Sequence, residues 1–410
     1  MMRKIMETNQ NKVNGFQLAA IHFTNELKSI FSDKGALLIL IGAVVIYPIV
    51  YSIGYYNETM TNMSVAVVDQ DHSAISRKYT AMIDASGELD VTYKPLDLIS
   101  AENLFLTNKI SGVILIPKGF EKEILSGLQA NVAVYADASY FLKYRNTILA
   151  ITYSNAYFSG GVSVMRYMAE GKSLQQAKVS NDPLPAYTHV LYNPSSGYGS
   201  FVMPGVILVI FQQTLLIGIG LLGGSFSESK ASPFLLPEQK RRREIIPYLT
   251  GKTVAYLAIS LFNIAYAAIL IHHWFNYPDK ANTLHIFMLL FPFLLATIFL
   301  GIGVSTLFKH RESAIVFMVF LSPIALFVSG LSWPVSSMPH WLVLLSKLMP
   351  GSTVIPAYLR LRTMGVDITE VKSEILFLYS QAAVYLGLTL VYFYIRMTAC
   401  CRKKTTLTKN

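Results

Sequence analysis

Three short stretches of the sequence have residue types that nucleotide-hydrolysing proteins use. In SVAVVDQD, residues 64–71, four apolar residues run into Asp69, as in the magnesium-holding strand of P-loop ATPases. LSGLQ, residues 125–129, differs by one residue from the nucleotide-binding signature LSGGQ, and GKT, residues 251–253, matches the end of a phosphate-binding loop. These fragments raise the question of whether the chain hydrolyses ATP.

The composition indicates a membrane protein instead. The 410 residues are 53% hydrophobic and only 14% charged, whereas soluble domains carry about 25% charged residues. Six segments have the roughly 20 mainly apolar residues that a membrane helix needs. They cover residues 36–56, 199–222, 253–271, 284–307, 314–332 and 376–395. Their length and lack of acidic residues disfavour core helices of a soluble protein, so we predict a polytopic α-helical membrane protein with six transmembrane helices.

The distribution of lysine and arginine predicts that both termini are cytoplasmic. This orientation places 18 of the 34 Lys and Arg inside, in segments 1–35, 225–252, 308–313 and 396–410. The long external insert has 11 Lys and Arg against 13 Asp and Glu, so it is nearly neutral. The net charge of +10 therefore reflects the inner membrane face, and nucleic acid is not needed to explain it.

The spans set the predicted domain order. Residues 1–35 are a cytoplasmic N-terminus, and residues 36–56 are the first span. Residues 57–198 are an extracytoplasmic domain, residues 199–397 a five-helix transmembrane region, and residues 398–410 a basic tail that contains both cysteines, Cys400 and Cys401. Within the five-helix region we expect a cytoplasmic coupling loop, 225–252, and an external loop, 333–375.

Residues 15–33 predict an amphipathic helix before the first span. Apolar residues recur at steps of four and three along one face. They are Phe16, Ala20, Phe23, Leu27 and Ile30. Such a helix either lies in the membrane interface, which we favour, or packs on protein.

The external insert predicts an α/β domain. Its four expected strands are MSVAVVD, LDVTYK, SGVILIP and NVAVYAD, with helices between them. Ser100 is the expected N-cap of one helix, and a long helical stretch is expected over residues 139–175.

The three ATPase-like fragments are chance matches. SVAVVDQD and LSGLQ fall within the external insert, and so lie outside the cell. GKT lacks the upstream glycine of GxxxxGK[ST], since Ile246 stands there, so we interpret Gly251 and Lys252 as an anchor at the foot of the third span.

No Asp, Glu, Lys or Arg lies within the six predicted span cores. Ion-driven carriers usually keep such groups, so this absence disfavours coupling to a proton or sodium gradient. Gln212, Gln213, Asn263 and Gln381 could line a substrate path, or equally could join helices by hydrogen bonds. Gly220 and Gly224 form a GxxxG step that predicts close helix packing.

The layout of one span, a large external α/β insert and five further spans resembles the permease subunit of type-2 ABC exporters. The resemblance covers nearly the whole chain and rests on stretches in the family's order, including VAVVDQDHSAISRKY, VILIPKGFEKEILSG and YNPSSGYGSFVMPGVI. The external-loop pattern falls on Pro334, Met338, Pro339, Trp341 and Pro350. The inner loop after the second span departs from the family, in which many members have a glutamate followed by a Gly-Thr pair. The Gly-Thr pair is missing here, and Glu228 or Glu238 would have to replace the glutamate.

The resemblance implies a non-enzymatic permease of a bacterial inner or plasma membrane. It would bind no cofactor itself, since ATP and Mg belong to a partner, the cytosolic ABC ATPase subunit. A second permease, alike or related, and in some bacteria a periplasmic adaptor protein would be further partners. Family substrates are drugs, lipids or glycan precursors. The alternative function is a receptor or scaffold that displays the external domain without transport.

Two groups of residues are candidate sites. The ATPase-coupling candidates are Glu228, Glu238, Lys240, Arg241, Arg242, Arg243 and Glu244, and EQKRRREII is expected to form a short helix there. The bland alternative is that the basic residues only bind anionic lipid. The external-gate candidates are Trp333, Pro334, Pro339, Trp341 and Pro350, expected on short broken helices, with plain surface anchoring as the alternative.

The orientation can be tested by cysteine labelling. Ser86→Cys and Ser232→Cys are introduced singly into a variant without Cys400 and Cys401. An impermeant thiol reagent on intact cells, or on spheroplasts where an outer membrane is present, should label only the cysteine at position 86. Labelling at position 232 alone would invert the topology.

Overall fold

The computed structural model describes residues 14–229, 234–236 and 240–407. The chain divides into two compact units, one made of residues 1–58 and 190–410 and the other of residues 59–189. We call them the membrane unit and the insert unit, and each is described by itself.

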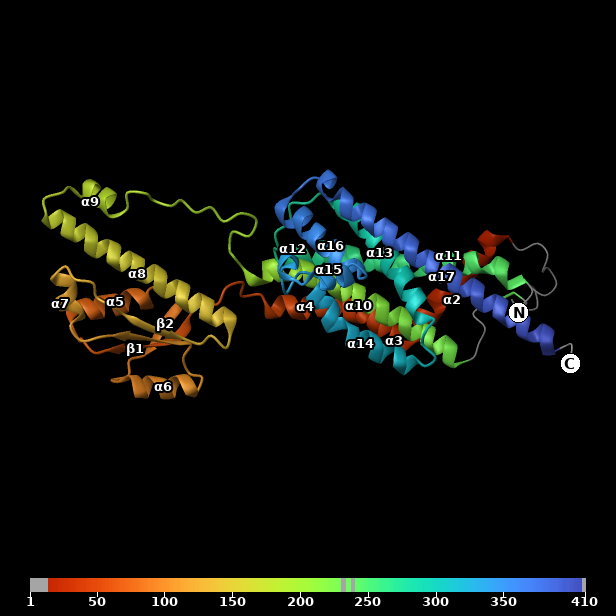
Figure 1. Ribbon diagram of the computed structural model, residues 1–410, viewed down its shortest axis with the longest axis horizontal. Coiled ribbons are helices and arrows are strands. Elements are labelled where there is room, and N and C mark those ends of the chain that lie inside the picture. Colours follow the sequence, from red (N-terminus) through yellow and green to blue (C-terminus); the bar gives the residue numbers. More distant parts are fainter. Residues whose placement is uncertain (1–13, 230–233, 237–239, 408–410) are drawn as a thin grey trace. The chain divides into compact units, whose positions relative to one another are not determined.

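The insert unit is a four-stranded sheet covered by helices on both faces (Figure 1). The four expected strands are confirmed, in the spatial order β2-β1-β3-β4, with only β4 antiparallel to its neighbour. They are β1 Met63–Asp69, β2 Leu89–Tyr93, β3 Gly112–Ile116 and β4 Ala133–Ala136. Helix α6, Leu98–Leu106, covers one face, and the other carries α5 Ala74–Asp84, α7 Phe120–Leu125 and α8 Phe141–Ala169.

The carboxyl ends of β1 and β3 form the point where the strand order reverses, the usual place for a phosphate ligand in such sheets. Here the chain fills that place itself. The Asp71 carboxylate accepts hydrogen bonds from the backbone N–H of Gly119 (2.8 Å) and of Glu121 (3.0 Å). Asp69 likewise accepts from the N–H of Asp71 and from the Ser76 hydroxyl. Both carboxylates of SVAVVDQD therefore stabilise loops of the insert unit.

Two local predictions in the insert unit were wrong. Asp97, not Ser100, is the N-cap of α6, and its carboxylate accepts from the Ser100 N–H. The stretch 139–175 is not one helix, because α8 ends at Ala169 and Gly171 adopts a left-handed conformation before α9, Leu174–Asn181.

The membrane unit confirms the six predicted membrane helices. They are Lys34–Gly54 (α3, η1 and α4), Tyr198–Glu228 (α10), Arg241–Trp274 (α11, η3 and α12), Thr283–Ser305 (α13), Arg311–Val328 (α14) and Ile368–Met397 (η6 and part of α17, which runs Lys372–Leu407). Helix α10 is the central one, since its span is the most buried of the six.

The third membrane helix starts earlier than predicted. It begins at Arg241 rather than at residue 253, so EQKRRREII forms no separate short helix within the described residues. Gly251 and Lys252 lie inside α11 and are buried, rather than anchoring the foot of a span. As α10 continues to Glu228, the connection between the two helices is only residues 229–240.

A broken helix pair, α15 His340–Ser346 and α16 Pro350–Leu359 extended by η5 Arg360–Met364, lies in the predicted external loop. The two parts are bent by 93°. Pro339 precedes the first helical residue of α15, and Pro350 is the first residue of α16, where the missing N–H of proline costs no helical hydrogen bond. We call this element the hairpin.

Glycines allow helices of the membrane unit to approach closely. The predicted packing role of the Gly220–Gly224 step is confirmed, since Gly220 faces Ala314 of α14 and Gly224 lies against the Arg311 backbone. Helix α2, Gly15–Ser32, crosses α11 at Gly251. A Cβ there would lie 2.6 Å from the Ala19 carbonyl oxygen and close to α2 backbone.

This crossing predicts that Gly251→Ala destabilises the protein by about 1–3 kcal/mol, because backbone would have to move. Gly387→Ala in α17 is the matched control, since no atom lies within 4 Å of its added Cβ. Thermal unfolding of both variants in the same detergent measures the difference. Equal unfolding midpoints would contradict the close crossing.

Candidate functional site

A ladder of buried polar pairs joins α2 to α11. His22 Nε2 lies 2.8 Å from Glu244 Oε1, and Lys252 Nζ lies 2.9 Å from Glu26 Oε1. The Tyr256 hydroxyl donates to the same Glu26 oxygen at 2.5 Å. All five side chains are buried. Since a buried charge is stable only when it is paired, these contacts fix the position of α2 along α11.

Glu244 also holds the connection between α10 and α11. Its two carboxylate oxygens accept from the backbone N–H of Leu235 (2.6 Å) and Leu236 (2.7 Å). With His22, three donors from two separate segments converge on one carboxylate. Glu244, a predicted coupling residue, therefore lies inside the protein, where it positions the connection rather than presenting a charge at the surface.

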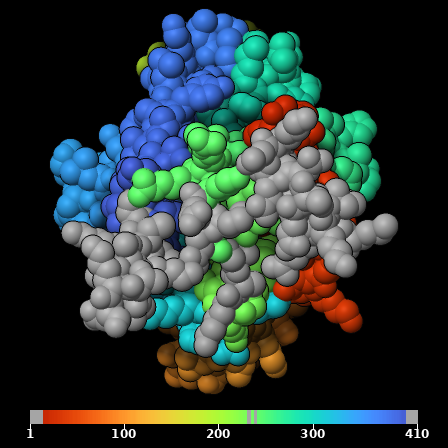
Figure 2. All heavy atoms as spheres, turned by 90° about the vertical axis from the view of Figure 1, so that its right-hand side faces the viewer, coloured from red at the N-terminus to blue at the C-terminus, as the bar shows by residue number. Residues whose placement is uncertain are grey.

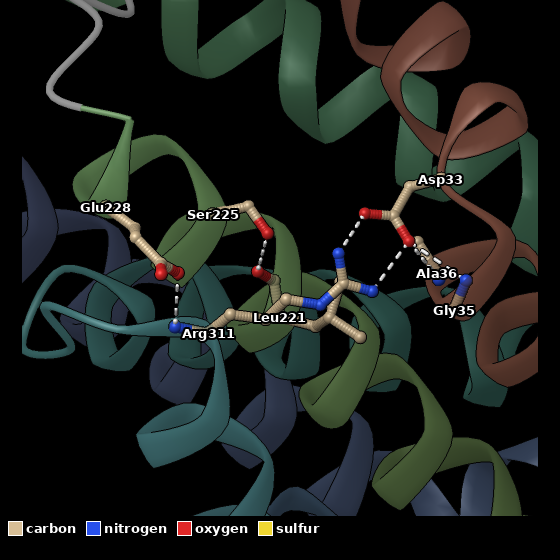
Figure 3. Close-up of polar contacts among 7 residues, drawn as sticks. All are labelled: Asp33, Gly35, Ala36, Leu221, Ser225, Glu228 and Arg311. Carbon is tan, nitrogen blue, oxygen red and sulfur yellow. Dashed lines mark hydrogen bonds and ion pairs between the residues drawn. The ribbon is translucent and has the colours of Figure 1, made fainter.

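A second ionic contact ties three other segments together at the same end of the membrane unit (Figure 3). The Arg311 guanidinium bonds both oxygens of Asp33, at 2.6 and 2.9 Å, and the Arg311 backbone N–H donates to Glu228 at 3.4 Å. Asp33 separates α2 from α3, Glu228 ends α10, and Arg311 begins α14. Burial alone would raise the pKa of Asp33, but Arg311 and the N–H groups of Ala36 and Gly35 hold it below its usual value.

The predicted basic residues start α11 beside this network. Arg241 donates to the Leu236 carbonyl at 3.3 Å, and Lys240 is the N-cap. The Arg242 guanidinium lies over the Tyr394 ring of α17, and Arg243 is exposed. Glu238 lies outside the described residues. Figure 2 looks onto this end, where the red atoms of α2 and the green atoms near the α10–α11 connection reach the surface.

Side chains from two membrane helices satisfy the broken backbone of the hairpin. Gln212 of α10 accepts from the Gly351 N–H at 2.5 Å. From α17, Gln381 donates to the Lys347 carbonyl (2.5 Å) and Tyr385 to the Leu348 carbonyl (2.6 Å). These backbone groups have no partner within α15 or α16 because the helices end there. A break at membrane depth is stable only with such partners.

A model of the ABC-2 family transporter proteins matches residues 34–391. The chain belongs to this family. The match runs from the start of the first membrane helix into the sixth, Ile368–Met397, and includes the insert unit and the hairpin. It confirms the resemblance to a type-2 ABC exporter permease. The permease is the membrane subunit of these transporters, so the chain is not an enzyme by itself and works with an ATPase subunit.

Two bacterial relatives match the permease along most of their length. The probable multidrug ABC transporter permease YbhS of Escherichia coli is 20% identical over 89% of this chain and 93% of its own. The linearmycin resistance permease protein LnrN of Bacillus subtilis is 20% identical over 84% of this chain and 91% of its own. ABC transporter G family member 20 of Dictyostelium discoideum is 25% identical over 43% of this chain, which spans only 24% of that protein. No solved structure matches.

The proposed path residues of the permease differ in their contacts. Gln212 holds the hairpin, and Asn263 donates to the Leu40 carbonyl of the first span at 2.7 Å. Both contacts are the helix-joining alternative that the sequence left open. Gln213 is only 5% exposed, and neither polar atom of its side chain has a hydrogen-bond partner among the described residues.

The gate candidates lie on or just before the hairpin. Trp341, in the first turn of α15, is 63% exposed, and Trp333 is 51% exposed. Pro334 precedes a short 3-10 helix, η4 Val335–Ser337. The two indole rings therefore lie on the surface of the single chain, where lipid or another subunit can contact them.

Sequence reasoning missed most of the charged network. His22 and Glu26 are one helical turn apart, as are Lys252 and Tyr256, and this spacing could have indicated two matching polar stripes. No sequence signal, however, pairs Asp33 with Arg311, which are far apart in the chain.

The ladder predicts a non-additive stability effect. Lys252→Met should destabilise the permease by about 3–5 kcal/mol because it leaves Glu26 buried without its cation. Glu26→Gln together with Lys252→Met should recover most of that loss, since Gln still accepts from Tyr256. Unfolding of the single and double variants in nanodiscs measures the coupling. Additive losses would show that the two residues do not form a pair.

Proposed function

We propose that this permease exports antibiotics or other drugs, using ATP that a separate cytosolic subunit hydrolyses. The observation that carries this proposal is the match along 93% and 91% of two bacterial permeases named for multidrug transport and linearmycin resistance. The termini face the cytoplasm of a bacterial cell, in agreement with the distribution of Lys and Arg. The insert unit then lies outside, where it is available to a periplasmic adaptor.

The ATPase contacts the permease around residues 229–240 and the start of α11. Glu244 binds this segment, and Arg311 joins Glu228 to Asp33. A displacement of the segment by the ATPase therefore moves α2, α10, α11 and α14 together. ATP and Mg stay on the partner. Arg243, which is exposed, is suited to a contact with that partner or with anionic lipid.

The hairpin forms the outer gate in this proposal. It is held by Gln212 of α10 and by Gln381 and Tyr385 of α17, so a change in the spacing of α10 and α17 moves it.

A second permease completes the substrate path. Exposed apolar side chains on α14 support such a contact, among them Val316, Phe317, Val319 and Phe320.

An efflux assay tests the proposal. The permease is expressed in a sensitive bacterium together with an ABC ATPase from the same genome, and growth is measured against linearmycin and a panel of unrelated drugs. Resistance should rise several-fold and vanish when the ATPase cannot hydrolyse ATP. The ATPase should also copurify with the permease.

Trp341→Ala tests the gate. It should lower efflux several-fold while the ATPase still copurifies, because the change is confined to an exposed hairpin residue. Trp274→Ala, at another exposed tryptophan outside the hairpin, is the control and should keep parent efflux. Normal efflux with Trp341→Ala removes the gate role. Failure to find any ATPase partner would favour the receptor or scaffold function instead.

A further inference from the structure

The insert unit contains a pocket away from the residues discussed so far. It has a volume of about 280 Å³ and opens between α5, α8 and the segment that leads from α7 to β4. This volume is near the lower limit for pockets that hold small organic ligands. Figure 1 shows α5, α7 and α8 together on one face of the sheet.

One wall of the pocket is aromatic. The rings of Phe120 and Phe158 stack with centroids 6.1 Å apart, and Tyr79 meets Phe158 edge-on at 5.1 Å. The Tyr79 hydroxyl donates to Asn155, and burial raises the pKa of Tyr79 to about 12, so this wall offers no ionised group. Ile124 and Val162 extend the apolar lining.

The rim of the pocket is cationic. Arg166 lines it and donates one hydrogen bond, to the Ile124 carbonyl at 3.1 Å, which leaves further guanidinium N–H groups for a ligand. No Asp or Glu is among the lining residues, so no carboxylate neutralises Arg166 within the pocket. Ser159 and Ser163, one helical turn apart on α8, add hydroxyl groups beside it.

We propose that this pocket binds a small organic anion with an aromatic or short alkyl body. The body lies against Phe120, Phe158 and Val162, and the anionic group pairs with Arg166. Apolar burial supplies most of the affinity, while the charge-assisted hydrogen bond supplies the preference for an anion. This site goes beyond the proposed export function, because it lies wholly within the insert unit and does not depend on transport.

The test uses 2-naphthoate as the probe and 2-naphthamide as its uncharged match. The full-length permease in lipid nanodiscs is titrated by calorimetry, and the signal of empty nanodiscs is subtracted. The parent should bind 2-naphthoate saturably and at least tenfold more tightly than the amide. Absence of saturable binding, or equal affinity for the two compounds, overturns the proposal.

Three variants locate the site. Arg166→Gln should lower the affinity for 2-naphthoate at least tenfold and leave the affinity for 2-naphthamide unchanged. Arg145→Gln, at an exposed arginine of the same helix outside the pocket, is the matched control and should bind like the parent. Ser159→Trp should block both compounds by filling the cavity, with folding checked by thermal unfolding. Parent-like binding of 2-naphthoate by Arg166→Gln, or by a folded Ser159→Trp, overturns the proposal.

Discussion

The arrangement of the permease depends on one constraint, that charges buried between α2 and α11 must be paired. Glu26 and Lys252 are both buried, and either charge buried without the other would destabilise the fold by several kcal/mol. The pair therefore holds α2 at one position on α11, and the close approach at Gly251 makes that position possible. Helix α2 still exposes Phe16, so packing on protein leaves an apolar edge for a membrane interface.

The same constraint extends to both ends of the membrane unit. At one end, Glu244 fixes the α10–α11 connection, and Arg311 joins α10, α14 and the turn after α2. At the hairpin, Gln212 and Gln381 form hydrogen bonds with backbone groups that lipid could not satisfy. Helix α10 takes part at both ends. This one helix therefore contacts both the start of α14, through Glu228, and the hairpin, through Gln212.

The insert unit pairs its loop carboxylates in a similar way. Asp71 occupies the place where a related sheet would bind a phosphate, so a stretch that resembles an ATPase strand has a structural role. Arg166, by contrast, has no carboxylate partner within its pocket. An arginine with no carboxylate among the lining residues, beside an aromatic wall, is the feature on which the proposed anion site rests.

The sequence alone determined the six membrane helices, the four strands and the family, because hydropathy and local periodicity depend on neighbouring residues. It also indicated the broken hairpin, since prolines mark helix starts. It misplaced the start of α11, because Lys252 and Arg241 look like the end of a span until Glu26 is seen beside Lys252. Only the tertiary structure decided that Glu244 is buried, that Gln212 and Asn263 join helices and that Asp33 meets Arg311. Each of these depends on a partner far away in the chain, and sequence spacing carries no information about such pairs.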